Sequence, residues 1–314
     1  MPQRIAGRDR GLCSIVMSRP ADNEVGETLR YEARCGWKPL RIASTGLFFL
    51  IFAIGTALTQ LLVLPWAYAL PKSSRDASWT SARIRRSRQL IHLLARGYVF
   101  TMRGMDLLDF RRVQGDRKDP AGVLVIANHP TLLDAVFMMT VLPQAAFVVK
   151  RSLARNPFTA FFIYSANYLV NHCEQELVEK GGAMLRGGDT LVLFPEGTRS
   201  TDPYQPQFKR GAAHVALVAK APISLWCIGC YPATLQRGQA WYDVPDRRSL
   251  VVIESVERIT YPQWLAALEP GGNGATLKSG VAARRLTQYL TQRQHNAITD
   301  QITKFSVGAD TLYR

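Results

Sequence analysis

The sequence has few cysteines and few acidic residues for its 314-residue length. Only five cysteines are present, so the dense cysteine framework of a small secreted domain is excluded, and a reducing compartment fits them better. Aspartate and glutamate total 24 against 39 lysines and arginines, which gives a net charge of +15. An excess of this size indicates an anionic partner: nucleic acid, an anionic membrane, or a phosphorylated or acidic substrate.

Several sequence motifs are also missing. The glycine-rich stretch EPGGNGATLKSG, residues 269–280, lacks the Gly-Lys-Ser/Thr ending of a phosphate-binding loop. The chain has no Gly-x-Ser-x-Gly motif to present a serine nucleophile and no nucleic-acid-binding motif. WCIGC, residues 226–230, looks like a redox motif, but it lies on a predicted strand rather than at a helix start. No second cysteine pair completes a zinc site, so we expect neither redox chemistry nor a bound metal.

One long stretch lacks charge altogether. No charged side chain occurs between Ile42 and Leu70, whereas ~20 apolar residues suffice to cross a bilayer core. The run is also too long for the apolar core of a signal peptide. It predicts a membrane helix, bent or ended near Pro65, with a fully buried core helix as the alternative.

Basic residues flank this run unequally. Two precede it, Lys38 and Arg41, whereas the larger group follows it: Lys72, Arg75, Arg83, Arg85, Arg86, Arg88 and Arg96. The positive-inside rule then predicts that the body of the protein faces the cytoplasm, and we expect it at the inner (cytoplasmic) membrane. Residues 82–100 mix arginine with Ile, Leu and Phe, which favours an interfacial helix on anionic lipids. An ordinary surface helix with a solvated basic face is the alternative.

The pattern along the chain predicts three segments. Residues 1–36 form a loosely ordered extension, 37–100 the membrane helix plus the basic interfacial helix, and 101–314 a globular domain. Within that domain, strands are predicted over Val123–Ala127, Ala146–Lys150, Tyr168–Asn171, Thr190–Phe194, Ile223–Ile228 and Leu250–Ser255. Helices are predicted over Leu132–Leu142, Pro157–Ser165, Glu174–Leu185, Gly211–Ala219 and Val281–Gln292. Because strands and helices alternate, we predict an α/β fold with a mostly parallel sheet flanked by helices, preceded by an N-terminal membrane-associated helical segment.

The stretch VLVIANHPTLLDAVFMM, residues 123–139, places polar side chains in an apolar run. His129 and Asp134 would lie roughly 140° apart on a continuous helix, but Pro130 favours a turn at His129 with the helix after it. Asp134 could then orient the imidazole while its other nitrogen takes a proton from a hydroxyl. The alternative is structural: Thr131 and Asp134 form a capping box, and His129 is a core histidine.

A second polar motif follows an apolar strand. In LVLFPEGTRS, residues 191–200, Gly197 permits close backbone approach to a ligand, and Arg199 offers a planar fork of donors suited to phosphate. Glu196 would bind a substrate hydroxyl or hold Arg199, and a surface turn with a Glu–Arg pair is the alternative. FKRGAAHVA, residues 208–216, brings Lys209 to a helix start, where anions bind.

The stretches NHPTLLD, FPEGTRS and FKRG, in this order, resemble the motifs of the glycerolipid acyltransferase family, which includes bacterial 1-acyl-glycerol-3-phosphate (lysophospholipid) acyltransferases. The resemblance covers roughly residues 101–260 and makes 101–314 an acyltransferase catalytic domain. It implies acyl transfer from a thioester, acyl-CoA or acyl-carrier protein, to a lysophospholipid hydroxyl, with His129 as general base oriented by Asp134. It further implies substrate binding by these residues: Asn128, Lys150, Glu196, Gly197, Thr198, Arg199 and Lys209.

The same resemblance sets the expected partners. They are anionic membrane lipids, the lyso-lipid acceptor and, for one of the two donors, an acyl-carrier protein. Neither a cofactor nor a metal is required beyond the acyl donor, and nucleic acid is not expected.

Two positions depart from the family's usual pattern. Asn171 stands where the family often has arginine, and Leu225 where a second proline is usual, although Pro222 is kept. These departures leave open an acceptor without phosphate, such as another lyso-lipid or a specialised lipid anchor. A different class of protein, a non-catalytic basic protein that binds membranes or nucleic acid, is the remaining alternative.

Overall fold

The computed structural model describes residues 38–69, 77–113, 121–202, 205–268 and 279–310, with the side chains of 62–69, 77–81 and 305–310 excepted. The predicted N-terminal extension lies outside the described residues, as does most of the glycine-rich stretch. The helices are α1 (Lys38–Ala69), α2 (Ala77–Gly104), α3 (Asp134–Val141), α4 (Arg151–Arg155), α5 (Pro157–Ser165), α6 (Glu174–Arg186), α7 (Gly211–Ala219), α8 (Tyr261–Leu268) and α9 (Ser279–Asp310). The strands are β1 (Leu108–Val113), β2 (Leu124–Ala127), β3 (Ala146–Lys150), β4 (Leu169–Asn171), β5 (Leu191–Leu193), β6 (Ile223–Tyr231) and β7 (Ser249–Ile259).

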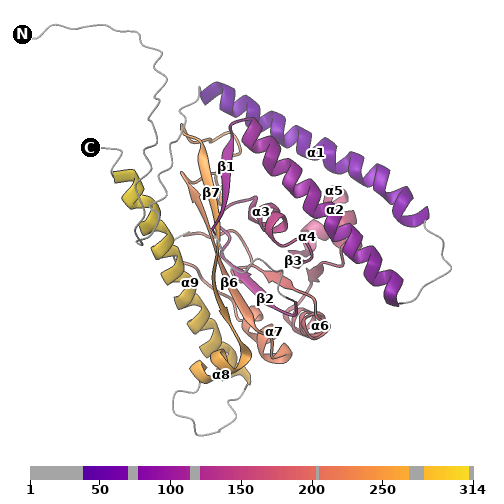
Figure 1. Cartoon of the computed structure of the whole chain (residues 1–314), viewed down its shortest axis with the longest axis vertical. Coiled ribbons are helices and arrows are strands. Elements are labelled where there is room, and N and C mark those ends of the chain that lie inside the picture. Colours follow the sequence, from indigo (N-terminus) through magenta and orange to yellow (C-terminus); the bar gives the residue numbers. More distant parts are fainter. Residues whose placement is uncertain (1–37, 70–76, 114–120, 203–204, 269–278, 311–314) are drawn as a thin grey trace, which may run out of the picture.

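The seven strands form one sheet in the order β1-β7-β6-β2-β5-β3-β4. Every neighbouring pair is parallel except β6 and β7, so the predicted mostly parallel sheet is confirmed. Figure 1 shows the sheet between helical layers, with α9 on one side and α2 and α3 on the other. The carboxyl ends of β2, β3, β4, β5 and β6 therefore meet at one edge, where α/β folds place their ligands.

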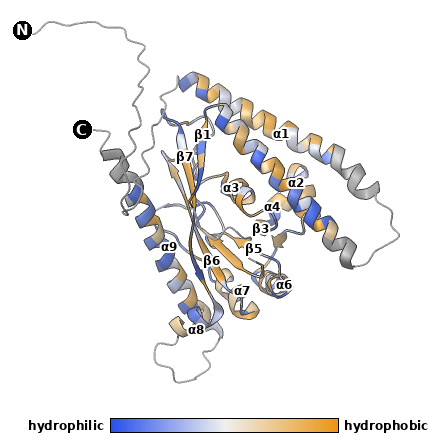
Figure 2. Cartoon of the chain, viewed as in Figure 1, coloured by the Kyte–Doolittle hydropathy of each residue, from blue (hydrophilic) through white to orange (hydrophobic). Residues whose placement is uncertain are grey.

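The middle of the sheet is the driest part of the core. Residues 123–127 have no solvent exposure, and β5 and most of β6 are also buried. A parallel strand covered by helices on both faces reads as a continuous apolar run rather than an alternating one. These strands are orange in Figure 2, and their continuous apolar pattern is why they were predicted to within a few residues.

Five elements differ from the prediction. Strand β1 and helices α4 and α8 were not predicted, and α9 continues to Asp310, well beyond the predicted Gln292. β1 is an edge strand with the sequence LDFRRV, in which arginines replace the apolar run of a central strand. Helix α3 begins at Asp134 rather than Leu132, so Pro130 stands in the turn before the helix and not in its first turn.

Helix α1 lies along the domain and exposes an apolar stripe. Residues Lys38–Leu61 are long and apolar enough to cross a membrane, and the outward stripe consists of Leu47, Leu50, Ile54, Leu58 and Leu61. The opposite face packs on α2, where the ring centroids of Phe52 and Tyr98 lie 4.7 Å apart. Figure 2 shows α1 mostly orange along its described length. The length and composition of α1 thus agree with the predicted membrane helix, and its association with a membrane stays a prediction.

The basic residues after α1 do not all face outward. Arg85, Arg86 and Arg96 are exposed on α2, whereas Lys72 and Arg75 lie outside the described residues. Arg88 is only 4% exposed and donates to Ala166 O, Gln144 O and the Asp189 carboxylate. Arg88 therefore fastens α2 to the sheet domain. The predicted boundary between residues 100 and 101 falls inside α2, and the division into domains stays a prediction.

Candidate active site

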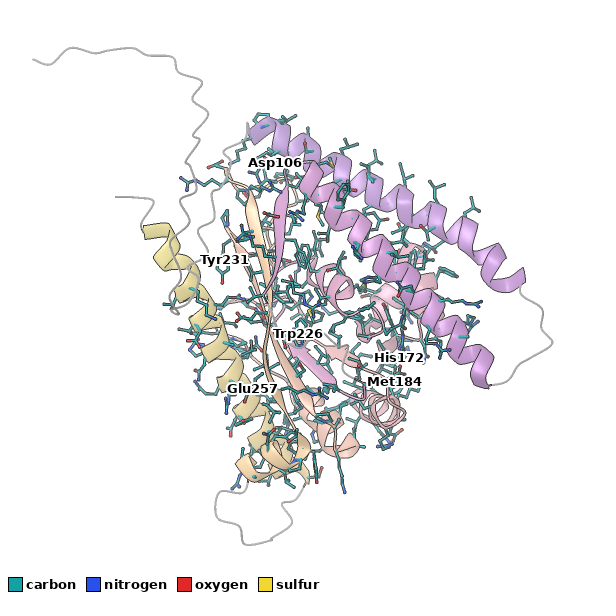
Figure 3. The ribbon with its side chains drawn as sticks, in the orientation of Figure 1. Asp106, His172, Met184, Trp226, Tyr231 and Glu257 are labelled. Carbon is teal, nitrogen blue, oxygen red and sulfur yellow. The ribbon has the colours of Figure 1, made fainter. Side chains whose placement is uncertain are left out.

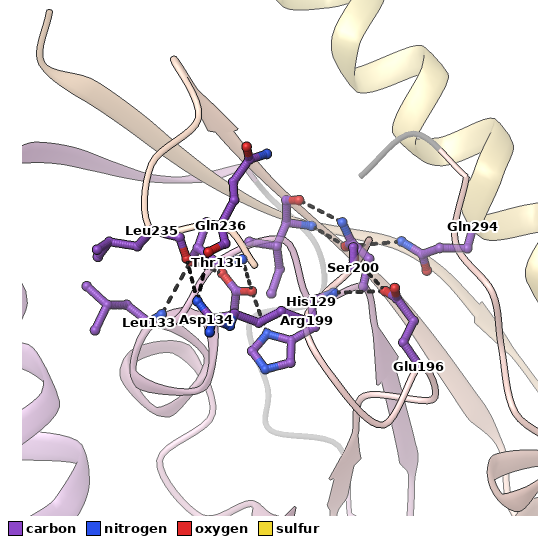
Figure 4. Close-up of polar contacts among 12 residues, drawn as sticks. His129, Thr131, Leu133, Asp134, Glu196, Arg199, Ser200, Leu235, Gln236 and Gln294 are labelled. Carbon is purple, nitrogen blue, oxygen red and sulfur yellow. Dashed lines mark hydrogen bonds and ion pairs between the residues drawn. The ribbon is translucent and has the colours of Figure 1, made fainter. Parts of the chain in front are cut away.

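The first predicted motif forms the turn between β2 and α3. His129 follows the end of β2, and Asp134 is the first residue of α3. His129 Nδ1 lies 2.7 Å from Asp134 Oδ2, and Asp134 has no solvent exposure. The structure thus brings together the two residues that the sequence pattern singled out (Figure 4).

Asp134 also shapes the turn itself. Thr131 donates its backbone N–H to Oδ2 at 2.7 Å and its hydroxyl to Oδ1 at 2.5 Å, while Leu133 N donates to Thr131 Oγ1. The Asp134 carboxylate therefore makes both the contacts that the capping interpretation requires and the contact that the histidine-orienting interpretation requires. An ionised carboxylate only accepts hydrogen bonds, so its contact with His129 requires a proton on Nδ1. That tautomer leaves a lone pair on Nε2, the nitrogen directed away from Asp134.

The second motif lies directly against the first. The ring of Phe194 stacks on His129 with centroids 4.5 Å apart. Glu196 Oε1 accepts from His129 N at 3.2 Å and from Ser200 Oγ at 2.8 Å, and Ser200 N donates to His129 O. Glu196 is thus engaged with the histidine turn and not with Arg199, which contradicts the alternative of a surface turn with a Glu–Arg pair.

The environment of Glu196 is unfavourable for its charge. Burial raises the pKa of Glu196 above its usual value, and the nearby Asp134 carboxylate acts in the same direction. The hydrogen bonds from Ser200 and from His129 N oppose this shift in pKa without cancelling it. The Glu196 carboxyl therefore retains its proton to a higher pH than the carboxyl of an exposed glutamate does.

Gly197 and Lys209 are in close contact beside this loop. Gly197 has φ +69°, a left-handed conformation that favours glycine. A Cβ at this position would lie 3.2 Å from Lys209 Nζ, so the ammonium group rests over the glycine backbone. Lys209 N donates to Pro195 O, which holds the start of the FKRG stretch against the FPEGTRS loop. The two sequence motifs therefore form one surface.

Arg199 fastens the loop that follows β6. Its Nη1 donates to Leu235 O at 3.1 Å and to Gln236 O at 2.9 Å, and Leu132 N donates to the same Leu235 carbonyl. Among the described residues, Arg199 Nε and Nη2 have no hydrogen-bond partner. The sequence did not predict these carbonyl contacts, because nothing in the local pattern links residue 199 to residues 235 and 236.

Asn128 is held by β6 and by α9. Its side-chain amide donates to Ile228 O and accepts from Ile228 N, at 2.9 and 2.8 Å. Gln294 of α9, which is fully buried, donates to Asn128 Oδ1 at 3.3 Å and to Trp226 O at 3.1 Å. These contacts fix the residue before His129, and substrate contact by Asn128 remains a prediction. Gln294 was missed because it stands in a helix with no motif, far along the chain.

The remaining predicted residues stand at the same edge of the sheet. Lys150 ends β3 and Asn171 ends β4, and both are exposed, while Thr198 is half-buried. β5 lies between β2 and β3, so Lys150 stands roughly 10 Å to the side of the histidine turn at the usual spacing of strands. Lys150 and Asn171 are thus near the first motif but not in contact with it.

The cysteine pair of WCIGC lies inside β6. Both thiols are buried, and burial raises the pKa of Cys227 and brings the pKa of Cys230 to about 12. Neither thiol is therefore ionised near neutral pH, as redox attack would require. In the described part of the chain, no group of three or more His, Cys, Asp or Glu residues is placed to hold a metal ion.

Comparison with known proteins connects this geometry to one family. The family described as Acyltransferase matches residues 111–228. A 1-acyl-sn-glycerol-3-phosphate acyltransferase of Cocos nucifera is 24% identical over 191 residues, which cover 59% of this chain and 56% of that protein. One of the same name from Saccharomyces cerevisiae is 31% identical over 140 residues, covering 42% of this chain and 46% of that protein. The chain thus spans about half the length of the curated relatives that it matches.

The fold also has a solved counterpart. The crystal structure of the 1-acyl-sn-glycerophosphate (LPA) acyltransferase PlsC from Thermotoga maritima superimposes with a TM-score of 0.62. It covers 84% of this chain and 98% of that one, at 19% sequence identity. This likeness establishes the fold.

Proposed function

We propose that the protein moves a fatty acyl group from a thioester donor to the hydroxyl of a lysophospholipid such as 1-acyl-glycerol-3-phosphate, because residues 111–228 match the family described as Acyltransferase. The observation that carries the proposal is the 2.7 Å contact between His129 Nδ1 and a fully buried Asp134 carboxylate. This contact leaves Nε2 able to accept a proton at the edge of the sheet.

The proposed reaction is a direct transfer. The acceptor hydroxyl gives its proton to His129 Nε2 while its oxygen attacks the thioester carbonyl, and Asp134 stabilises the imidazolium that forms. The carbon–sulfur bond then breaks, and the proton passes from His129 to the departing thiolate. No covalent enzyme intermediate is needed, which agrees with the absence of a Gly-x-Ser-x-Gly motif.

Acceptor binding is proposed for the surface made by the second motif. Lys209 Nζ lies over Gly197, and Arg199 keeps donors beyond those used by the loop carbonyls, so an anionic headgroup would find charge and N–H groups there. Thr198 and Lys150 would widen this surface. Glu196 would support it by holding His129 N and Ser200 Oγ.

An acceptor without phosphate is the second candidate. Asn171 supplies no charge at the end of β4, and Nη1 of Arg199 is occupied by Leu235 O and Gln236 O. Fewer free cationic donors remain than a phosphate site commonly has. The uncharged Asn171 and the loop contacts of Arg199 thus both favour an acceptor without phosphate.

The chain is proposed to act at a membrane surface, with its catalytic domain on the cytoplasmic side of the inner membrane. Contacts between α1 and the domain run from Arg41, which donates to Leu107 O, to Gln60, which donates to Phe158 O. Residues 41 to 60 of a helix cover about 29 Å. A helix with domain contacts along that length fits one leaflet better than a full crossing, because a crossing would place polar elements in hydrocarbon.

The donor is proposed to be acyl-CoA or acyl-carrier protein. Both are anionic, and the net charge of +15 suits either. We therefore expect no cofactor apart from this co-substrate.

A panel assay tests the proposed function. Purified protein in phospholipid vesicles is given a labelled acyl group on either donor, together with lyso-lipids that carry or lack a phosphate. We expect transfer to at least one phosphate-bearing lyso-lipid. Transfer only to acceptors without phosphate would establish the second candidate, and no transfer from either donor would contradict both.

A further inference from the structure

The loop between β6 and β7, residues 232–248, links the candidate active site to α1. At one end it is bonded to both motifs of the site. Leu235 O accepts from Leu132 N and Arg199 Nη1, each at 3.1 Å, and Gln236 O accepts from Arg199 at 2.9 Å. Figure 4 shows Leu235 and Gln236 beside Arg199 and the histidine turn.

The other end of the loop rests on α1. The Trp241 ring meets the Phe49 ring edge-on at 6.5 Å, and it lies so near Gly46 that a Cβ there would come within 3.3 Å of it. Asp246 forms an ion pair of 3.3 Å with Lys38 at the start of the same helix. In Figure 3, Tyr231 marks the end of β6, after which the loop begins.

The outer surface of the loop carries two adjacent aromatic side chains. Trp241 is 48% exposed and Tyr242 57% exposed, and their rings meet edge-on at 5.6 Å. On α1, Leu47 and Leu50 are exposed, and they follow in sequence Gly46 and Phe49, the two residues that Trp241 meets. Trp and Tyr combine a large apolar ring with a polar N–H or O–H, so they gather where hydrocarbon meets headgroups.

From this arrangement we propose that Trp241 and Tyr242 insert into the headgroup region of a phospholipid bilayer beside α1. The loop 232–248 is then a second membrane contact, separate from the apolar helix. A bilayer fits this surface because Trp241 meets α1 next in sequence to the exposed Leu47 and Leu50, on a helix that is long and apolar enough for a membrane segment.

Contact between this loop and the membrane would also affect the candidate active site. Its carbonyls hold Arg199 and Leu132, so the position of the loop at the bilayer sets the position of these two residues. A lyso-lipid in the same leaflet would meet Arg199 without leaving the membrane. This step rests on the proposed function, whereas the lipid contact itself does not.

Fluorescence quenching by brominated phospholipids tests the lipid contact. The emission of Trp241 is obtained as the difference between wild type and Trp241→Phe, in vesicles whose lipids carry bromine near the headgroup end of the acyl chain. We expect this difference to be quenched. The matched control is Trp264→Phe, because Trp264 is fully buried and bonded to Ala221 O, and its difference emission should be unaffected.

A binding and activity measurement tests the coupling. We expect the double variant Trp241→Ala, Tyr242→Ala to bind vesicles about tenfold more weakly, the scale of losing a buried large apolar side chain. Val218→Ser, which alters an exposed apolar residue on α7, should bind as wild type does. Acyl transfer should fall for acceptors held in vesicles and be kept for a short-chain acceptor in solution.

Three results would overturn the inference. The first is that brominated lipids do not quench the emission of Trp241, and the second is that the double variant binds vesicles as tightly as wild type. The third is that the protein self-associates in detergent and that Trp241→Phe abolishes this association, because Trp241 would then contact a second copy of the chain. Quenching and vesicle binding need no catalysis, so a wild-type protein without acyl transfer would refute the proposed function and leave the lipid contact to be decided separately. If the double variant fails to fold, the quenching of wild type against Trp241→Phe still decides.

Discussion

Asp134→Asn separates the two tasks of one buried carboxylate. In the wild type, Oδ2 accepts from Thr131 N and His129 Nδ1, and Oδ1 accepts from the Thr131 hydroxyl. Asparagine can keep its oxygen at the Oδ2 position, because Thr131 N needs an acceptor there. Its NH₂ group then faces the Thr131 hydroxyl, which is able to accept as well as donate. The turn and the histidine tautomer should both survive the substitution.

What asparagine removes is the negative charge that stabilises the imidazolium. A hydrogen bond to a charged group contributes about 1.5–3 kcal/mol, and each ~1.36 kcal/mol corresponds to tenfold in rate. We therefore expect kcat to fall by roughly 10- to 150-fold, with the KM of either substrate little changed and the melting temperature near that of wild type.

Initial rates of acyl transfer and thermal unfolding of the same preparations decide the matter. Asp134→Ala serves as the contrasting variant, because it loses the Thr131 contacts and should unfold at a lower temperature. Near-normal kcat for Asp134→Asn would show that the negative charge of Asp134 does not stabilise the transition state, and would leave this residue only its roles in holding the turn and orienting His129. A large loss of stability in Asp134→Asn would show that the turn, and not the charge, was perturbed.

Three further variants probe the surrounding residues. Because burial raises the pKa of Glu196, the native state keeps this proton to higher pH than the unfolded chain does, and this residue lowers stability as pH rises through that window. Glu196→Gln should therefore melt above wild type near neutral pH, with the gain disappearing toward about pH 4 in a series of melting curves. Arg199→Lys should raise the acceptor KM by an amount worth about 1–3 kcal/mol if Arg199 grips phosphate, whereas a lower melting temperature without an acceptor-selective defect would assign it to the loop alone. Gln294→Leu removes the hydrogen bonds to Asn128 Oδ1 and Trp226 O, so the free energy of unfolding should fall by about 1–3 kcal/mol. We also expect kcat to fall while substrate affinity is kept, and an unchanged kcat would refute a positioning role for Gln294.

Residues close together in the sequence were the ones that could be placed from the sequence. The central strands are continuous apolar runs because helices cover both faces, and the His129–Asp134 contact spans a single turn. Both follow from local patterns. The edge strand β1 was missed because its charged side chains resemble a loop rather than a buried strand.

Contacts between segments far apart in the sequence could not be predicted from local patterns. Arg199 meets Leu235 and Gln236 through their carbonyl groups, which every residue carries, so no residue type marks the contact. Gln294 reaches Asn128 from a helix far along the chain, and its burial depends on how α9 packs on β6. A Glu–Arg pair was one alternative because the two residues are close in sequence, but burial against the histidine turn gives Glu196 other partners.

The most direct test of the central claim is the rate of acyl transfer by His129→Ala. The proposed base activates the acceptor hydroxyl, so its loss should lower kcat by roughly 10²–10⁴-fold while folding and vesicle binding are kept. His214→Ala is the matched control, since His214 lies on α7 near Glu174 and outside the site, and it should transfer at the wild-type rate. Turnover by folded His129→Ala equal to that of wild type would contradict the account.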